Sequence, residues 1–356
     1  MNYEQKIKEL LLLAGEEGAS DLHLGVAKKP MLRIDGVLVP VDREPILTPQ
    51  TAEGLIYALL TEDQKNKLAM KREIDFSFSL EEKVRFRVNV YYQRGYVAAA
   101  LRLIPWVIRT VEQLNLPTIL HEFTKIQQGF FLVTGPAGQG KSSTLAALID
   151  EINHTQAAHI ITIEDPVEYL FVQDKSIVSQ REIGSDALNF HLALRSVLRQ
   201  DPDAIMIGEM RDAETIATAL TAAETGHLVF STLHTNSAVQ TIDRIIDSFP
   251  ADQQGQVRSQ LAESLVGVLS QRLLPRIQGG LVPAYELMIA NSAIRNLIRE
   301  EKAYQIDLVI ETGLQEGMMS LNRSLADLIT RGEVSLDTAL VYSLNPEELG
   351  SLLEPK

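Results

Sequence analysis

The ten residues 135–144, GPAGQGKSST, restrict how this chain folds more than any other stretch. Glycines at three of the first six positions let the backbone adopt conformations that other residues resist. The stretch follows the apolar run GFFLVT, which is typical of a buried strand, and it precedes LAALIDEIN, whose apolar residues recur at helical spacing. A strand, a glycine-rich loop and a helix in direct succession indicate an α/β fold.

The same residues match the pattern G-x-x-x-x-G-K-[ST], with Gly135, Gly140, Lys141 and Ser142 at its fixed positions. Glycines allow successive backbone N–H groups to face an anion, and a helix that begins at Lys141 directs its positive end at the same place. Lys141 is expected to reach the β- and γ-phosphates of a nucleotide, and the Ser142 hydroxyl to bind Mg²⁺. A glycine turn with an exposed lysine is the alternative, which the flanking strand and helix disfavour. The predicted nucleotide contacts are Gly135, Pro136, Ala137, Gly138, Gln139, Gly140, Lys141, Ser142 and Ser143.

Strands that alternate with helices follow from Gly129 onward, which is the pattern of a parallel sheet covered on both faces. The predicted strands are Phe130–Thr134, His159–Ile163, Ala204–Ile207 and His227–Thr232. Each apolar run ends in polar residues. Because ligands of open α/β sheets bind outside the carboxyl ends of the strands, we expect these polar residues to converge on one crevice.

The chain is longer than one hydrophobic core usually supports, so two domains are expected of its 356 residues. Residues 1–105 show the pattern of a small α+β domain, in which predicted strands have alternating polar and apolar residues and helices are predicted at Tyr3–Ala14 and Pro49–Arg72. Hairpins are predicted at Asp35-Gly36 and at Glu81–Lys83.

Residues 106–128 are expected to form a linker with a short helix or two, and residues 129–356 the second domain. Beyond Phe249 a set of apolar residues recurs at helical spacing: Val257, Leu261, Leu265, Val268, Leu269 and Leu273. We therefore expect a helical C-terminal portion from about residue 250.

Composition restricts the partners of the chain. With 33 basic and 47 acidic residues the formal net charge is −14, which disfavours nucleic acid and anionic lipid as partners and favours protein. The absence of cysteine excludes disulfides and thiolate zinc sites, as expected in a reducing cytoplasm. No apolar run approaches the roughly 20 residues of a membrane helix, so stable membrane insertion is not expected.

Hydrolysis needs a carboxylate that orients water and a further metal contact besides the loop. Glu209 follows the apolar run Ala-Ile-Met-Ile-Gly, where an acid that faces a metal is expected. Glu164, Asp165 and Glu168 all lie in IEDPVEY, and chemistry alone does not choose among them. His234, just past the end of a predicted strand, is the histidine best placed to sense a γ-phosphate.

Several segments together resemble one family, the secretion and type IV pilus motor ATPases. Its four boxes occur in order as GPAGQGKSS, TIEDPVEY, DPDAIMIGEMRD and TGHLVFSTLHTN, and the earlier segments ASDLHL and LRIDG are also similar. Residues 293–300, AIRNLIRE, resemble the signature of the pilus retraction branch. Taken alone, that stretch predicts an amphipathic helix with Arg295 and Arg299 on its exposed side. The chain lacks the four-cysteine module and long N-terminal extension common in extension and secretion motors, as expected of a retraction motor.

The resemblance implies a fold: a RecA-like P-loop NTPase core with a mostly parallel sheet, preceded by a PAS-like α+β domain and followed by a helical portion. It implies ATP and Mg²⁺ as cofactors, with Ser142 and Glu209 on the metal side. By match, Glu168 resembles the general base and His234 the residue of the His box. Arg87 and Arg102 match arginines of the N-terminal domain that contact the phosphates.

The resemblance also implies a homohexameric motor that hydrolyses ATP and powers type IV pilus retraction and twitching motility. Such a motor is expected in the cytoplasm, peripheral to the inner membrane at the pilus base, against a platform protein of that membrane. The alternatives are an assembly or type II secretion ATPase, and a nucleotide-regulated adaptor with little turnover. A nucleic-acid translocase is disfavoured by the charge of −14.

Overall fold

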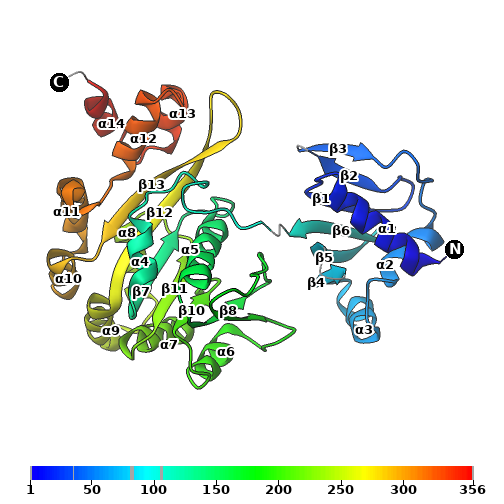
Figure 1. Cartoon of the computed structure of the whole chain (residues 1–356), viewed down its shortest axis with the longest axis horizontal. Helices are drawn as coiled ribbons and strands as arrows, with labels where there is room; N and C mark the ends of the chain where they lie inside the picture. Colours follow the sequence, from blue (N-terminus) through cyan, green and yellow to red (C-terminus); the bar gives the residue numbers. More distant parts are fainter. Residues whose placement is uncertain (1, 35, 81–83, 105–106, 355–356) are drawn as a thin grey trace. The chain divides into compact units, whose positions relative to one another are not determined.

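The computed structural model describes residues 2–34, 36–80, 84–104 and 107–354 (Figure 1). They divide into two compact units. The first unit comprises Met1–Val107 and Pro166–Leu170, and the second comprises Ile108–Asp165 and Phe171–Lys356. The segment Pro166–Leu170 therefore groups with the first unit although it lies within the second unit's stretch of chain.

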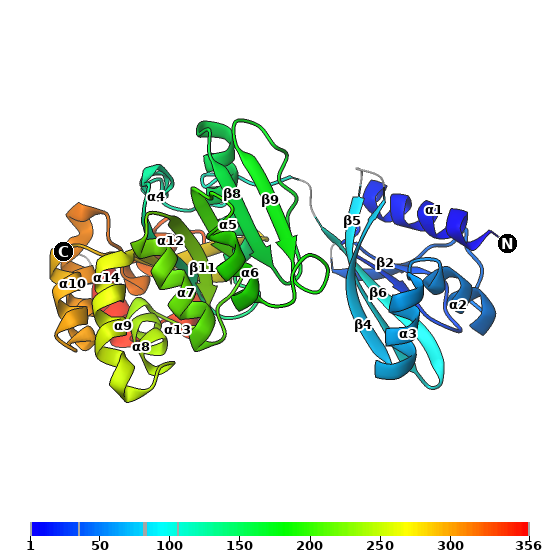
Figure 2. The same ribbon diagram turned by 90° about the horizontal axis from the view of Figure 1, so that it is seen from below.

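The described residues of the first unit form an antiparallel sheet with the strand order β3-β2-β1-β6-β5-β4. Figure 2 shows the helices α1, α2 and α3 next to this sheet. The strands are β1 (Asp21–Leu24), β2 (Met31–Ile34), β3 (Val37–Pro40), β4 (Glu73–Leu80), β5 (Val84–Gln93) and β6 (Tyr96–Ile104), and the helices are α1 (Tyr3–Glu16), α2 (Pro49–Tyr57) and α3 (Glu62–Lys71).

The single helix expected over 49–72 is wrong, because the structure has two. Helix α2 ends at Tyr57, and α3 begins after Thr61. Thr61 accepts a hydrogen bond from the backbone of Gln64, whose side chain accepts one from the backbone of Thr61. This reciprocal cap starts a new helix and fixes the break. The predicted hairpins agree with the pairing of β2 with β3 and of β4 with β5, although Asp35 and residues 81–83 lie outside the described residues.

The described residues of the second unit form a sheet with the strand order β13-β12-β7-β11-β10-β8-β9. All neighbouring pairs are parallel except β12 with β13. The mostly parallel sheet of the expected fold class is thus confirmed. The strands are β7 (Gly129–Thr134), β8 (His159–Glu164), β9 (Ile177–Glu182), β10 (Ala204–Ile207), β11 (Leu228–Leu233), β12 (Leu265–Pro275) and β13 (Leu281–Ile289).

Helices cover both faces of this sheet. Phe130 and Leu132 of β7 pack into a core on one face, and Phe131 and Val133 pack into a core on the other, as expected from the alternation of side chains along a strand. The first core includes residues of α6 (Phe190–Val197), α7 (Ala213–Glu224), α8 (Ala238–Asp247), α9 (Ala251–Ser264), α10 (Ser292–Arg299) and α11 (Ile306–Thr312), and the second includes residues of α4 (Leu120–Lys125) and α5 (Lys141–Thr155).

The helical periodicity expected from Leu265 to Leu273 is wrong, because these residues form β12. The strand is buried on both faces, so its apolar residues carry no period of two. The hairpin signal lies further on, where Gly279 and Gly280 have φ of 88° and 79° between two apolar runs. The chain becomes helical after β13, and α12 (Leu321–Thr330), α13 (Leu336–Tyr342) and α14 (Pro346–Leu353) pack on the ends of β12 and β13.

Within the described part of the chain, we find no helix with the length and apolar character needed to traverse a lipid bilayer.

Candidate active site

The glycine-rich loop leaves β7 and enters α5. Gly135, Gly138 and Gly140 have φ of 143°, 75° and 81°, conformations that favour glycine. Gly140 is also the N-cap of α5. Because glycine has no side chain, this helix has no side-chain cap among the described residues. By contrast, α6, α7 and α8 begin with side chains that accept hydrogen bonds from the first turn. The N-terminal N–H groups of α5, which directly follow the glycine-rich loop, therefore suit a phosphate.

Lys141 lies buried inside the loop that precedes it. Its Nζ donates to the backbone oxygens of Gly135 and Pro136, both at 2.8 Å. The same Nζ lies 3.5 Å from Nδ1 of His234. The ammonium is therefore held within the loop, where a phosphate group would replace carbonyl oxygens as its partner.

Glu209 follows β10 and meets His234, which follows the neighbouring strand β11. Oε2 of Glu209 lies 3.6 Å from Nε2 of His234, and Oε1 pairs with the Arg211 guanidinium. The carboxylate raises the pKa of Arg211. Lys141, His234 and Glu209 therefore form one connected row across three adjacent strand ends, as the convergence argument predicted.

Gly208 explains why the acid is displaced one residue beyond the strand. Its N–H donates to the backbone oxygen of Ile163 at 2.8 Å, so it lies against β8. A Cβ at this position would approach that oxygen to 3.3 Å, which is a tight contact. A glycine here lets the chain cross beside β8 before Glu209 turns toward His234.

The three acids of IEDPVEY lie in different surroundings. Glu164 is buried at the end of β8, where its Oε1 accepts from Thr162 at 2.7 Å and from Gln180 at 3.1 Å. Asp165 and Glu168 are exposed. The buried acid is engaged with its own sheet, so geometry separates Glu164 from the other two.

The first unit holds the remaining predicted residues. Arg87 of β5 and Arg102 of β6 are direct cross-strand partners and both are exposed. They line a hollow of about 110 Å³ together with Glu168. Arg102 also donates from Nε to Oδ1 of Asp21 at 3.0 Å. Two guanidinium groups and a carboxylate are thus gathered within one unit, while the loop, Glu209 and His234 belong to the other.

The helix that carries AIRNLIRE differs from the expectation. Ile294 and Ile298 are buried as predicted, but Arg295 does not lie on an exposed side. Its Nη1 donates to the backbone oxygen of Ala262 at 2.6 Å and to that of Glu263, and its Nε donates to that of Ala290 at 3.0 Å. Arg295 therefore caps the C-terminal end of α9, because the last carbonyls of a helix lack partners.

Residues of β12 that the sequence did not suggest also reach the site. Gln271 is hydrogen-bonded to the loop, and Arg272 donates from Nη2 to Oδ1 of Asn236 at 2.8 Å, two residues after His234. They were missed because β12 was expected to be helical. Polar residues within a run followed by a Gly-Gly turn are the signal that would have found them.

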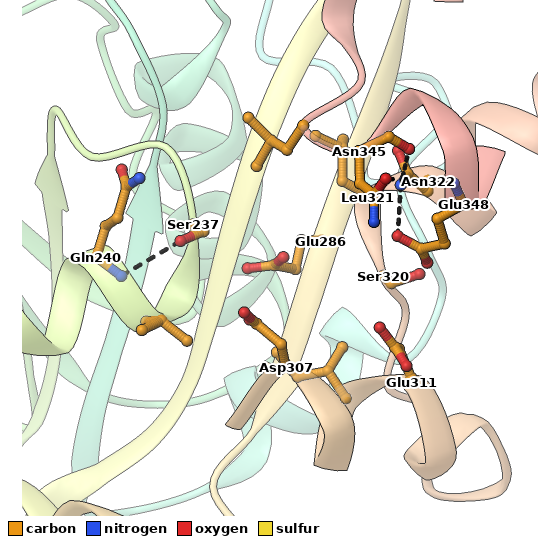
Figure 3. Close-up of a pocket in the computed structure, with 13 residues that line it drawn as sticks. Ser237, Gln240, Glu286, Asp307, Glu311, Ser320, Leu321, Asn322, Asn345 and Glu348 are labelled. Carbon is orange, nitrogen blue, oxygen red and sulfur yellow. Dashed lines mark hydrogen bonds between the residues drawn. The ribbon is translucent and has the colours of Figure 1, made fainter. Parts of the chain in front are cut away.

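A second cavity, of about 380 Å³, lies among β13, α8, α11 and the C-terminal helices. Figure 3 shows four carboxylates along it, from Glu286, Asp307, Glu311 and Glu348. Burial raises the pKa of Glu286 to about 7. The hydrogen bond that its Oε1 accepts from the Ala238 N–H, at 2.7 Å, lowers the pKa but has the smaller effect. This cavity contributes no residue to the predicted nucleotide contacts.

The residues around the loop fit a nucleoside triphosphate with Mg²⁺. The N-terminus of α5 and the Lys141 ammonium suit its phosphates. Ser142 is exposed in the first turn of α5, and Glu209 supplies a carboxylate. Hydroxyl and carboxylate oxygens are the ligands that Mg²⁺ prefers. Such an ion, when bound, would neutralise charge on the phosphates.

Comparison with known proteins gives a consistent family. Residues 2–281 match the family model described as "Type II/IV secretion system protein". The chain is 47% identical to the "Type IV pilus retractation ATPase PilT" of Pseudomonas aeruginosa, over 96% of this chain and 99% of that protein. It is 45% identical to a "Twitching motility protein" of Neisseria gonorrhoeae, over 90% of this chain and 86% of that protein.

A solved structure extends the likeness to three dimensions. The crystal structure of the pilus retraction motor PilT with bound ADP matches with a TM-score of 0.91 and 50% identity, over 97% of this chain and 98% of that one. Sequence and fold thus agree over nearly the whole length. The chain belongs to the family of type II/IV secretion system proteins, the family that includes the pilus retraction ATPases.

Proposed function

We propose that this chain is the ATP-hydrolysing motor that powers type IV pilus retraction. The observation that carries this proposal is the connected row of Lys141, His234 and Glu209 at the mouth of the phosphate loop. A loop alone binds a nucleotide, whereas a lysine for the phosphates and an acid for the metal at neighbouring strand ends supply two of the groups that phosphoryl transfer uses. The match to the retraction ATPase over nearly its full length selects the process that the motor drives.

In the proposed mechanism the loop and the N-terminus of α5 hold the phosphates. Lys141 exchanges its contacts with the backbone oxygens of Gly135 and Pro136 for the β- and γ-phosphates. Ser142 and Glu209 would contact Mg²⁺ when it is bound. Glu168 orients the attacking water and accepts its proton, and His234 senses the γ-phosphate.

We further propose that Arg87 and Arg102 contribute positive charge to the phosphates during turnover. Glu168 lies in the same hollow as both arginines. An arginine supplied by a moving element contributes a factor of about 10³ to 10⁵ in related nucleotide hydrolases. Turnover would then depend on these two arginines as well as on the loop.

The proposed assembly is a homohexamer in the cytoplasm, peripheral to the inner membrane at the pilus base. Its proposed partner is the platform protein of that membrane, and successive hydrolysis around the ring would withdraw pilin subunits from the fibre. The net charge of −14 supports a protein partner rather than nucleic acid.

Replacement of Lys141 at the native locus tests this function. We expect Lys141→Ala to abolish twitching and to leave cells with excess pili, because assembly continues while retraction stops. Lys125→Ala, which removes an exposed lysine paired with Glu122, is the matched control and should twitch normally. If cells with Lys141→Ala carried no pili, the chain would instead be an assembly motor. A purified parent chain that binds ATP without turnover would indicate an adaptor.

A further inference from the structure

Gln139 occupies a position that the phosphate-loop pattern leaves open, yet its side chain reaches across to β12. Its Oε1 accepts a hydrogen bond from the backbone N–H of Leu273 at 2.6 Å. Gln271 completes the contact in the other direction, because its Nε2 donates to the backbone oxygen of Gln139 at 2.5 Å. Loop and strand are therefore joined reciprocally by two glutamines, although 132 residues separate them in the chain.

The other end of the Gln271 amide is also engaged. Its Oε1 accepts from the Thr144 hydroxyl at 2.8 Å, and Thr144 lies in the first turn of α5. Gln271 is only 2% exposed, so water is not an alternative partner for this amide. Reversing the amide would set its oxygen against the backbone oxygen of Gln139, which is acceptor against acceptor, so the orientation with Nε2 toward the loop is favoured.

The glycines of the loop fit closely against the same strand. A Cβ at Gly135 would lie 2.5 Å from the backbone oxygen of Gln271, a separation that real Cβ atoms essentially never show. A Cβ at Gly140 would lie 3.0 Å from Nε2 of Gln271. The loop is thus packed against β12 at both of its ends, and the two glutamines bond it there.

We propose that Gln139 and Gln271 are positioning residues that hold the phosphate loop in its nucleotide-binding shape before the nucleotide arrives. The proposal rests on the proposed role of this loop. Ordering a loop in advance removes that cost from binding. Since the bonds join protein groups only, their loss weakens binding of the ground state and of the transition state alike, which raises KM and leaves kcat unchanged.

The test compares ATP turnover and ADP binding in the parent chain and in Gln271→Met, which keeps the side chain's length and removes its hydrogen bonds. We expect KM for ATP and Kd for ADP to rise about tenfold, as for the loss of one or two hydrogen bonds, with kcat within about twofold of the parent. Gln139→Ser, which removes only the bond to Leu273, should raise both constants about threefold.

Asn322→Leu is the matched control. Asn322 is buried in the C-terminal helices, where its Nδ2 donates to the backbone oxygen of Asn345 at 2.9 Å and to Oε2 of Glu348 at 2.6 Å (Figure 3). Its replacement should lower the melting temperature and leave KM and Kd unchanged. Rescue of a low KM by Gln271→Glu is not expected, because a carboxylate cannot donate to the Gln139 oxygen.

Three outcomes would overturn the proposal: parent-like KM and Kd in Gln271→Met, a fall in kcat at unchanged KM, or equal changes in Asn322→Leu. If Gln271→Met does not fold, Gln139→Ser decides, because Gln139 is only half-buried and its change leaves β12 intact. A parent chain that binds no ADP would contradict the proposed function itself. A parent chain that binds ADP, but no more tightly than its variants do, would contradict only the positioning role of the two glutamines.

Discussion

At the scale of single residues, Glu286 has the clearest consequence of burial. Its carboxyl lies beside Asp307 in the second cavity, and burial raises its pKa from 4.5 to about 7. In the unfolded chain this group loses its proton near pH 4.5, whereas in the folded chain it keeps the proton to about pH 7. The folded state is therefore stabilised below the lower value, and this stability is lost as pH rises through that window.

Glu286→Gln should remove the loss of stability with rising pH, because an amide stays neutral and still accepts a hydrogen bond from the Ala238 N–H. Relative to the parent, the variant should gain on the order of 3 kcal/mol in the free energy of unfolding between pH 4.5 and pH 8. Urea denaturation of both chains at pH 5 and pH 8 measures this. An equal difference at the two pH values would contradict the raised pKa.

The sequence predicted some residues of the site and could not predict others. Lys141, Glu209 and His234 were expected to converge because each follows a strand of one parallel sheet, and the structure brings them together. The contact of Gln139 could not be predicted, because its partner is a backbone N–H 134 residues away on a strand that shows no period of two. The structure shows the positions of these side chains, and the catalytic roles remain predictions for all of the proposed residues: Glu168, Glu209, His234, Arg87 and Arg102.

At the scale of helices and strands, His121 joins α4 to the helix that follows the phosphate loop. Its Nδ1 lies 2.7 Å from Oε2 of Glu151 on α5, and its Nε2 lies 2.6 Å from Oε1 of Glu112. These carboxylates, Glu151 foremost, raise the pKa of His121. The ion pairs stabilise the folded chain fully below the ordinary pKa of 6.5, and the contribution is lost as pH rises through the folded value.

We expect His121→Gln to lower the melting temperature at pH 6 and to have a smaller effect at pH 9. Thermal unfolding of the two chains at both pH values is the measurement. Glu151→Gln removes the leading cause of the raised pKa, so it should weaken the pH dependence in the same sense. A melting difference that stays the same from pH 6 to pH 9 would rule out the charged histidine.

Arg295 shows how an element can be misjudged from spacing alone. Helical periodicity placed this arginine on the exposed side of α10, but it donates to three backbone oxygens at the C-terminal end of α9 and before α10. Periodicity gives the face of a helix and not the neighbour that covers it. The next element along from α9 is β12, which carries Gln271.

Arg295→Met should therefore destabilise the chain by about 1 to 3 kcal/mol, because three backbone oxygens lose a charged donor. Denaturant unfolding measures the change, with Arg299→Met as the control, since Arg299 is exposed on the same helix. Equal stability of the two variants would mean that the cap contributes nothing.

At the scale of the whole molecule, the predicted catalytic residues are divided between two compact units. The phosphate loop, Glu209 and His234 belong to the second unit, whereas Arg87, Arg102 and Glu168 group with the first. The central claim is that binding belongs to one unit and that the water-activating carboxylate comes with the other. Turnover then requires both, whereas nucleotide affinity requires the loop and the β12 residue Gln271 that holds it, all in the second unit.

Steady-state ATP hydrolysis by Glu168→Gln, measured with ADP affinity in the same preparation, tests this claim most directly. The exchange of a carboxylate for an amide keeps the shape and removes the base. We predict a fall in kcat of about 10² to 10⁴, the usual contribution of a general base, with the Kd for ADP unchanged. Full turnover by Glu168→Gln with normal nucleotide binding would contradict the account.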